Sequence, residues 1–139
     1  MPKKASLQSI ADDMVSSLLG TGKFEVARIA PVSSGIQILD ELEALTRLPG
    51  ALVAISRANY DEEGLERHLE LLVILADRYR QGGAAKSSGI WELLESIEQL
   101  AENGMYLRGI PFSLSRWEPV DAGKENITAF ALVFTGAEA

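Results

Sequence analysis

The chain has 139 residues, of which 47% are hydrophobic and 6% aromatic, and this composition suits one folded domain with a mainly aliphatic core. It contains no cysteine and one histidine, which excludes disulfide frameworks, thiolate metal sites and histidine-rich metal sites. The net charge of −7 disfavours a nucleic-acid binder, which usually needs a basic surface. We expect a single domain over residues 1–139, with an ordered core from about residue 6 to about residue 135.

Two features of the sequence bear on its compartment. No apolar run approaches the roughly 18 residues that a spanning helix needs. The basic start, Met1 to Lys4, precedes an amphipathic segment and not a continuous apolar one, which argues against a secretory signal. We therefore expect a cytoplasmic protein with no membrane partner.

Two segments have the periodicity of amphipathic helices, Ser6–Leu19 and Ile90–Asn103. In each, apolar residues recur at steps of three and four, with Ser6 as a fitting N-cap of the first helix. A shorter helical pattern over Ile38–Leu45 must end before Pro49, because the residue before a proline avoids the helical region.

Four segments are predicted to be strands. Phe24–Ile29 and Phe112–Glu118 alternate, the latter with Trp117 on the face opposite Phe112, whereas Ala51–Ile55 and Ile127–Phe134 are apolar on both faces. The last strand is therefore expected to be central in the sheet.

The connections are polar or rich in glycine. We expect an acidic connection over Ala58–Glu66, a flexible link over Gln81–Ser88 and a hairpin turn at Asp121–Lys124.

The segment from Arg67 to Arg80 fits both periods. A helix would align Leu65, Leu69, Leu72, Ala76 and Tyr79, whereas a strand would separate Leu69, Leu71, Val73 and Leu75 from Leu72 and Ile74. The residues alone leave helix and strand open. In either case the element order predicts an α+β domain, with a mostly antiparallel sheet of about four to five strands and helices packed on one face.

Candidate chemistry is sparse. His68 is a possible general base, but no nucleophile motif accompanies it. Asp61, Glu62 and Glu63 lack the alternating spacing of a calcium loop, and the glycines near Lys86 lack the spacing of a phosphate-binding loop. We predict no catalytic residue, no cofactor and no metal.

Three runs are apolar on both faces: Leu52–Ile55, Leu71–Leu75 and Ile127–Phe134. Two interpretations stand side by side. Either the chain covers a central sheet by itself, or apolar sheet surface remains for contact with other copies.

With its predicted helices and strands in this order along the sequence, the chain resembles the tail-terminator or tail-completion proteins of Mu-like contractile-tailed phages and prophages. The resemblance lies in the opening helix with Phe24–Ile29, the junction Leu45–Ala54, the stretch Leu69–Asp77, and Ser115–Glu118 with the closing Ile127–Phe134. In that family the third stretch is a strand, so the resemblance favours a strand over Arg67–Arg80.

The resemblance implies a structural protein that catalyses no reaction. Such subunits form rings, usually hexamers, that cap the finished tail tube, end its polymerisation and offer a surface to the head. The implied partners are other copies of the chain, the tail tube protein and a head-completion or neck protein. The implied location is the cytoplasm of a bacterial host and then the virion tail.

Within this interpretation we expect contacts at the sheet edges and nearby loops. The candidate interface residues are Tyr60, Asp61, Glu62, Glu63, Arg78 and Arg80, with the arginines pairing with acidic neighbours. The three acidic residues are expected to line a lumen through which DNA passes without sticking. The alternatives are a neck or head–tail adaptor of the same particle, and a small enzyme that uses His68.

Overall fold

The structure is a computed structural model that describes residues 4–30, 41, 47–78, 89–121 and 127–139. Three sequence predictions fall mainly outside these residues. They are the helix over Ile38–Leu45 except for Glu41, the link Gln81–Ser88 and the turn after Asp121.

The two strong helix predictions are confirmed. Helix α1 spans Leu7–Gly20, and helix α3 spans Gly89–Glu102. The Ser6 side chain caps α1 by accepting a hydrogen bond of 3.1 Å from the Ser9 N–H, which satisfies one of the free donors of the first turn. Most of the apolar stripe of each helix is buried, as the periodicity predicts, but Leu7 and Leu19 at the two ends of the α1 stripe are exposed. The buried members are Ile10, Ala11, Met14 and Leu18 in α1, and Ile90, Leu93, Leu94 and Ile97 in α3.

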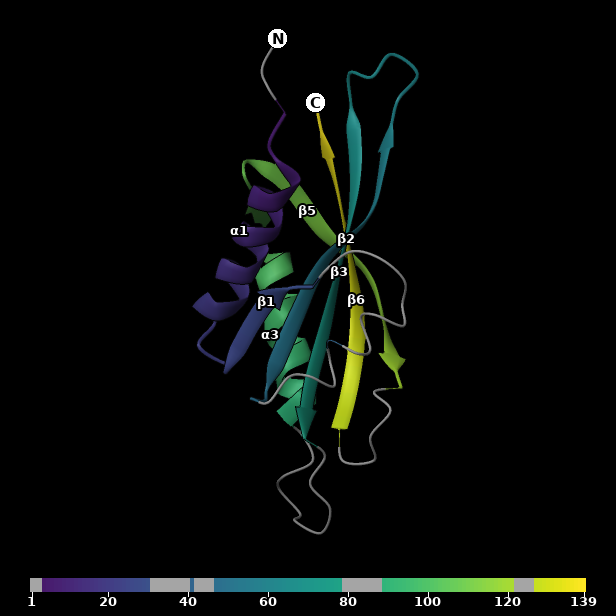
Figure 1. The fold of residues 1–139 in the computed structure, drawn as a ribbon. Helices are drawn as coiled ribbons and strands as arrows, with labels where there is room; N and C mark the ends of the chain where they lie inside the picture. The colour runs from purple at the N-terminus through teal and green to yellow at the C-terminus, as the bar shows by residue number, and fades with distance from the viewer. Residues whose placement is uncertain (1–3, 31–40, 42–46, 79–88, 122–126) are drawn as a thin grey trace.

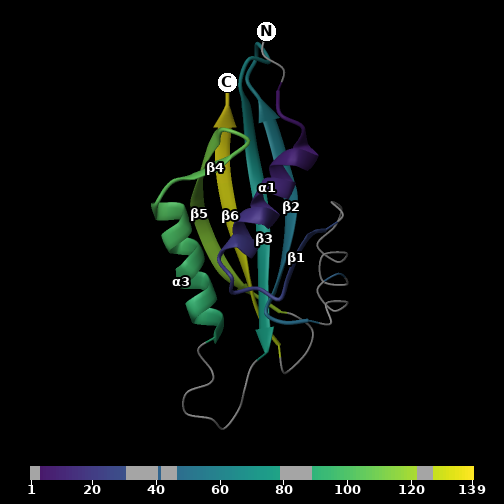
Figure 2. The ribbon, with the colours of Figure 1, turned by 90° about the vertical axis from the view of Figure 1, so that its left-hand side faces the viewer.

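The strands form one six-stranded sheet in the order β1-β2-β3-β6-β5-β4 (Figure 1). Their bounds are Val26–Ile29 (β1), Gly50–Tyr60 (β2), Arg67–Arg78 (β3), Met105–Leu107 (β4), Ile110–Val120 (β5) and Ile127–Glu138 (β6). Only β1 and β2 pair in parallel; the other pairs are antiparallel. Figure 2 shows α1 and α3 on the same side of this sheet. The α+β prediction is confirmed, with β6 central as expected.

The sheet has one strand more than the upper end of the predicted range. The addition is β4, a three-residue strand that turns into β5 through Arg108 and Gly109. Both turn residues have positive φ, 52° and 79°, which is the conformation of a tight two-residue hairpin. A strand of three residues is too short to show a period in the sequence.

Segment 67–78 is a strand, which resolves the ambiguity of its pattern. It pairs with β2 along one edge and with β6 along the other. Leu71, Val73 and Leu75 are fully buried on the face that carries the helices, and Ile74 and Ala76 are buried on the far face. Because both faces are covered, the run has no polar alternation from which its period could be identified.

A single copy buries its apolar strands. Leu52, Ile74, Ala129 and Ala131 on the far face are each at most 7% exposed, and Phe134 on the helix face is fully buried. The interpretation that these runs leave apolar surface uncovered is therefore wrong. Any contact between copies must use other surfaces.

A β-bulge in β5 reverses the predicted direction of Trp117. The register with β6 shifts between Leu114 and Arg116, which leaves Ser115 as an extra residue. Trp117 therefore lies opposite Leu132, on the helix face that Phe112 and Leu114 share, and not on the opposite face. Inserting one residue changes the face of every later side chain in a strand.

Candidate assembly interface

The hairpin of β2 and β3 extends past the helices and ends in an acidic tip (Figure 1). The predicted connection Ala58–Glu66 is too long, because Ala58, Asn59 and Tyr60 pair with β3 and only residues 61–66 connect the strands. The tip is held by hydrogen bonds within the loop: the Asp61 N–H donates to the Glu66 carbonyl at 3.1 Å, and the Leu65 N–H donates to the side-chain Oδ1 of Asp61 at 2.7 Å.

Four of the six predicted interface residues gather at this tip. Tyr60 is 60% exposed, and Asp61, Glu62 and Glu63 are exposed beside it. Arg78 lies at the opposite end of β3, where its N–H donates to Asp77 Oδ1 at 2.7 Å. The structure therefore separates Arg78 from the acidic tip, and Arg80 lies outside the described residues.

The base of the hairpin is fixed by an ion pair near both chain ends. Arg67 Nη2 lies 2.6 Å from Glu138 Oε1, and the side chains are only 8% and 12% exposed. Arg67 also donates to the Ala5 carbonyl at 2.7 Å, while the Ala5 N–H donates to Glu138 Oε2 at 2.9 Å. This cluster joins β3, β6 and the segment before α1, so the hairpin projects from a fixed base.

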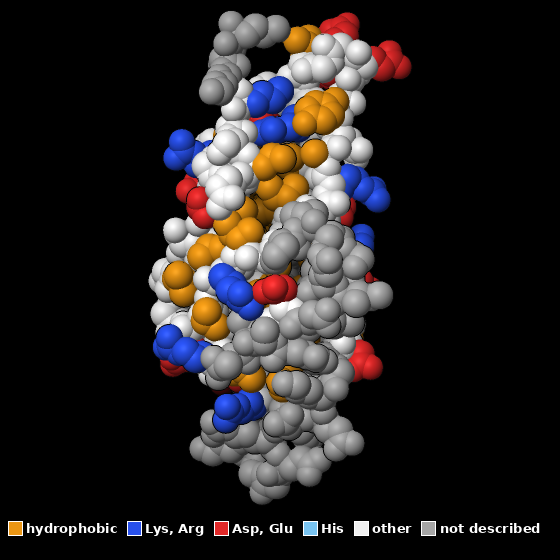
Figure 3. All heavy atoms as spheres, viewed as in Figure 1, with side chains coloured by type: hydrophobic (Ala, Val, Ile, Leu, Met, Phe, Trp, Pro, Cys, Tyr) orange, Lys and Arg blue, Asp and Glu red, His pale blue; other side chains and the backbone are white. Residues whose placement is uncertain are grey.

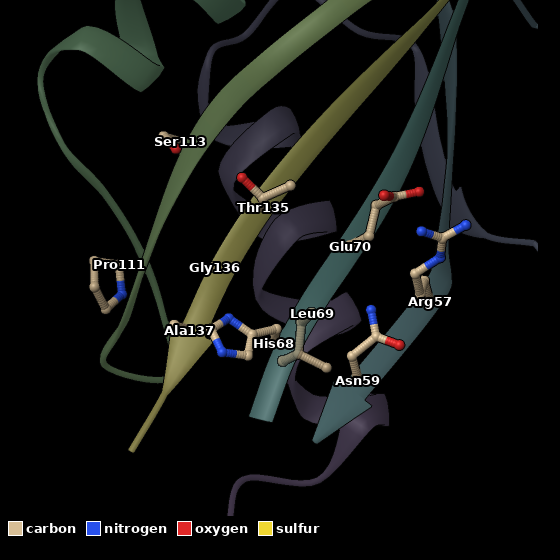
Figure 4. A pocket seen from close by; sticks show the side chains of 10 residues that line it. All are labelled: Arg57, Asn59, His68, Leu69, Glu70, Pro111, Ser113, Thr135, Gly136 and Ala137. Atoms are coloured by element: carbon tan, nitrogen blue, oxygen red, sulfur yellow. The ribbon is translucent and has the colours of Figure 1, made fainter. Parts of the chain in front are cut away.

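His68 lines an open polar groove on the far face of the hairpin (Figure 4). The groove has a volume of about 480 Å³, and its lining side chains come from β2, β3, β5 and β6. The lining residues are Arg57, Asn59, His68, Leu69, Glu70, Pro111, Ser113, Thr135, Gly136 and Ala137.

The groove has little of the character of an active site. His68 Nε2 lies 3.0 Å from Glu66 Oε1, but both side chains are about half exposed, at 55% and 45%. The Glu70 carboxylate accepts a hydrogen bond of 2.8 Å from Ser56 Oγ. Within the described residues, no three His, Cys, Asp or Glu side chains are grouped so that they could hold a metal ion. An imidazole in open solvent lacks the shelter that tunes a catalytic base.

Both edges of the sheet are open over part of their length in the described chain. Strand β1 pairs with β2 only from Gly50 to Val53, so the rest of β2 has no strand on that side. Strand β4 covers β5 only from Ile110 to Phe112, so the length beyond Phe112 has none either. Open edges are the places at which sheet proteins meet other chains.

An aromatic cluster lies at the β5 edge. The rings of Trp91 on α3 and Trp117 on β5 meet edge to face with centroids 6.1 Å apart, and both contact the buried ring of Phe130. The two tryptophans are 48% and 38% exposed. We call Trp91 and Trp117 the tryptophan pair.

An apolar groove lies at the other edge, between α1 and the strands β1 and β2. It has a volume of about 290 Å³ and is lined by Leu7, Gln8, Ala11, Ile29 and Ile55. In Figure 3, apolar side chains form a band along the side of the molecule on which these elements lie, with lysines and arginines beside it. We call this feature the α1 groove.

Neither the tryptophan pair nor the α1 groove follows from the pattern of the sequence. Leu7 belongs to the predicted stripe of α1, but it is 40% exposed because it lies at the edge of the sheet. Simple alternation along the strand predicts the wrong face for Trp117, because the extra residue of the bulge reverses the direction of the side chains that follow it. The sequence does place Trp91 outside the apolar stripe of α3, and this position indicates an exposed aromatic side chain on that helix.

Comparisons with known proteins add little to this description. No protein-family model matches the chain, and no curated protein matches it. Among solved structures, a chain of the "Virion of native gene transfer agent (GTA) particle" is similar over 94% of this chain and 91% of its own length, at 13% identity and a TM-score of 0.43. A likeness of this size identifies neither a family nor a function.

None of the described helices combines the length and the apolar character that a membrane span needs.

Proposed function

We propose that the protein is a structural subunit of a phage-like particle, in which copies form a ring that caps the tail tube, ends its polymerisation and offers a surface for the head. The residue blocks that resemble tail terminators support this role. The partners are then other copies of the chain, the tail tube protein and a head-completion or neck protein.

The observation that carries the proposal is the acidic hairpin tip on its fixed base. The tip presents Asp61, Glu62, Glu63 and Glu66 on a loop that its own backbone hydrogen bonds order, while the Arg67–Glu138 pair anchors the strands below it. A projecting charged element of this kind suits a contact or channel surface better than it suits catalysis. In a ring, carboxylates facing the lumen would repel passing DNA.

An enzymatic role for His68 finds less support in the site. Its imidazole faces an open groove, and its nearest charged partner, Glu66, is itself about half exposed. The competing structural role is that of a neck or adaptor protein of the same particle. In that role the protein would lie at a different joint of the particle.

The experiment is removal of the gene from the genome that encodes the particle, followed by electron microscopy. Overlong or headless tails are expected, and a plasmid copy of the gene should restore normal particles. Tails of normal length that lack heads would favour the neck role. Normal, filled particles without the protein would overturn the proposal.

The proposed position of the acidic tip in the lumen is tested by reversing the charge of its side chains. A triple variant in which Asp61, Glu62 and Glu63 become lysine should still form rings but should release DNA poorly, whereas the same change at Glu92, Glu95 and Glu102 on α3 should not alter DNA release. A ring structure with a basic lumen would contradict the assignment of the tip.

A further inference from the structure

We infer that two matched β-bulges, one near each edge of the sheet, block strand pairing between copies of this chain. Contacts between copies then have to use side chains and loops, and the open strand edges are excluded from them. The inference goes beyond the proposed ring, because it applies to any two copies that meet in solution.

The open edges create the need for such a block. In the described chain, β2 has no strand beside it past Val53, and β5 has none past Phe112. An edge of this kind presents backbone N–H and C=O groups that a strand of another copy can bind. Because the two open lengths lie toward opposite ends of the strand order, pairing of β5 with the next copy's β2 can repeat from copy to copy and build a fibre.

A bulge interrupts each open length. In β2 the register with β3 shifts just after Ile55, and the extra residue is Ser56. In β5 the register with β6 shifts just after Leu114, and the extra residue is Ser115. A bulge bends its strand and breaks the regular spacing of the backbone N–H and C=O groups, so a straight partner strand cannot keep its register along it.

The two bulges lie at the same level of the sheet. Ile55 and Leu114, the residues just before the extra serines, belong to one row of paired residues that runs through Leu71 and Phe134. A partner strand placed at the height of this row therefore meets a bulge at whichever edge it approaches.

The bulge in β2 is held by hydrogen bonds of its own serine. The Ser56 hydroxyl donates to Glu70 Oε1 at 2.8 Å and lies 3.2 Å from the Glu70 carbonyl oxygen. Glu70 is the residue of β3 that lies opposite Arg57, directly after the bulge. The extra residue is thus fixed to the neighbouring strand, and the irregular edge is a stable feature of the fold.

Charge reinforces the block. An arginine follows each bulge, so both edges carry the order aliphatic residue, serine, arginine, in Ile55–Arg57 and in Leu114–Arg116. Arg57 and Arg116 are exposed on the far face and lie two rows apart. If β5 of one copy paired with β2 of the next at the same height, these two cations would be diagonal neighbours about 7–8 Å apart. Pro119, further along β5, also has no N–H to offer a partner strand.

The experiment deletes the extra residues. Without Ser56 or Ser115, the residues on either side of each bulge become neighbours, and every paired residue of β2 and β5 keeps its partner and its face. Ser56→Ala with Ser115→Ala is the matched control, because it removes the hydroxyls and keeps both extra residues. Thermal melts establish that each variant is folded, and sedimentation with electron microscopy then measures association.

The double deletion should form fibres. The concentration at which half of the chain sediments should be at least about tenfold lower than for the wild type and the alanine control, a factor that corresponds to 1.4 kcal/mol of association free energy. Each single deletion frees one edge, so it should pair the wild-type species two by two and form no fibres. Folded deletion variants that sediment like the wild type at every concentration would overturn the inference.

A second variant decides the question if the deleted chains do not fold. Arg57→Thr with Arg116→Thr keeps both bulges and removes the two edge charges, and it should lower the same concentration by about two- to fivefold. The control is Lys23→Thr with Arg78→Thr, which changes the net charge equally at exposed positions away from the bulges. Equal sedimentation of these two variants would also overturn the inference. None of these outcomes bears on the role in a particle, which removal of the gene tests.

Discussion

Arg67 at the start of β3 and Glu138 at the end of β6 form an ion pair of 2.6 Å that is almost wholly shielded from solvent. The same two side chains bind both backbone polar groups of Ala5, the residue that precedes the N-cap of α1. The pair therefore couples the C-terminal strand, the base of the acidic hairpin and the entry to the first helix.

Removing one partner of this pair should be strongly destabilising. Glu138→Ala leaves the Arg67 charge buried and frees the Ala5 N–H, so we expect a loss of about 3 kcal/mol in the free energy of unfolding. Urea unfolding measures the change. The double variant Arg67→Met, Glu138→Leu should be more stable than Glu138→Ala, because no buried charge is left unpaired. Equal stability of Glu138→Ala and wild type would show that the pair is hydrated in solution.

Gly136 should not tolerate even a methyl group. A Cβ at this position would lie 2.8 Å from two carbons of the buried Phe112 ring and from the Pro111 carbonyl oxygen. We expect Gly136→Ala to lower the free energy of unfolding by about 1–3 kcal/mol through overpacking. Gly20→Ala is the control, because a Cβ there meets nothing within 4 Å, and a thermal melt of that variant should show an equal or higher midpoint.

The order of the acidic tip should depend on the Asp61 side chain. Asp61→Ala removes the acceptor of the Leu65 N–H, a hydrogen bond worth about 1 kcal/mol. Amide hydrogen exchange at Leu65 should accelerate, while exchange in the central strands stays unchanged. Glu62→Ala, which removes an exposed carboxylate with no hydrogen bond in the described chain, should leave the exchange of Leu65 as it is. Similar rates in both variants would mean that the backbone bonds alone order the tip.

His68 should be dispensable. Its contact with Glu66 is a surface pair, so His68→Ala should change the free energy of unfolding by less than about 1 kcal/mol. The solution mass of the assembly should also be that of the wild type. An activity that disappears in this variant while assembly persists would instead support the enzyme alternative.

Local patterns of residues were enough to predict the two helices and the class of the fold. The apolar stripes of α1 and α3 repeat over about four helical turns. A repeat of this length arises because one face of the helix must be buried, so it can be recognised from the local sequence. The local sequence also indicated the central place of β6, because a strand without a polar face needs cover on both sides.

The surfaces that are left for contact could not be predicted in this way, because they depend on how distant segments pack. The direction of Trp117 depends on a single extra residue in β5, and the ion pair of Arg67 depends on a partner at the far end of the chain. The coverage of both sheet faces depends on packing between segments remote in sequence. Such relationships arise from strand register and long-range packing, which a local pattern of residues does not encode.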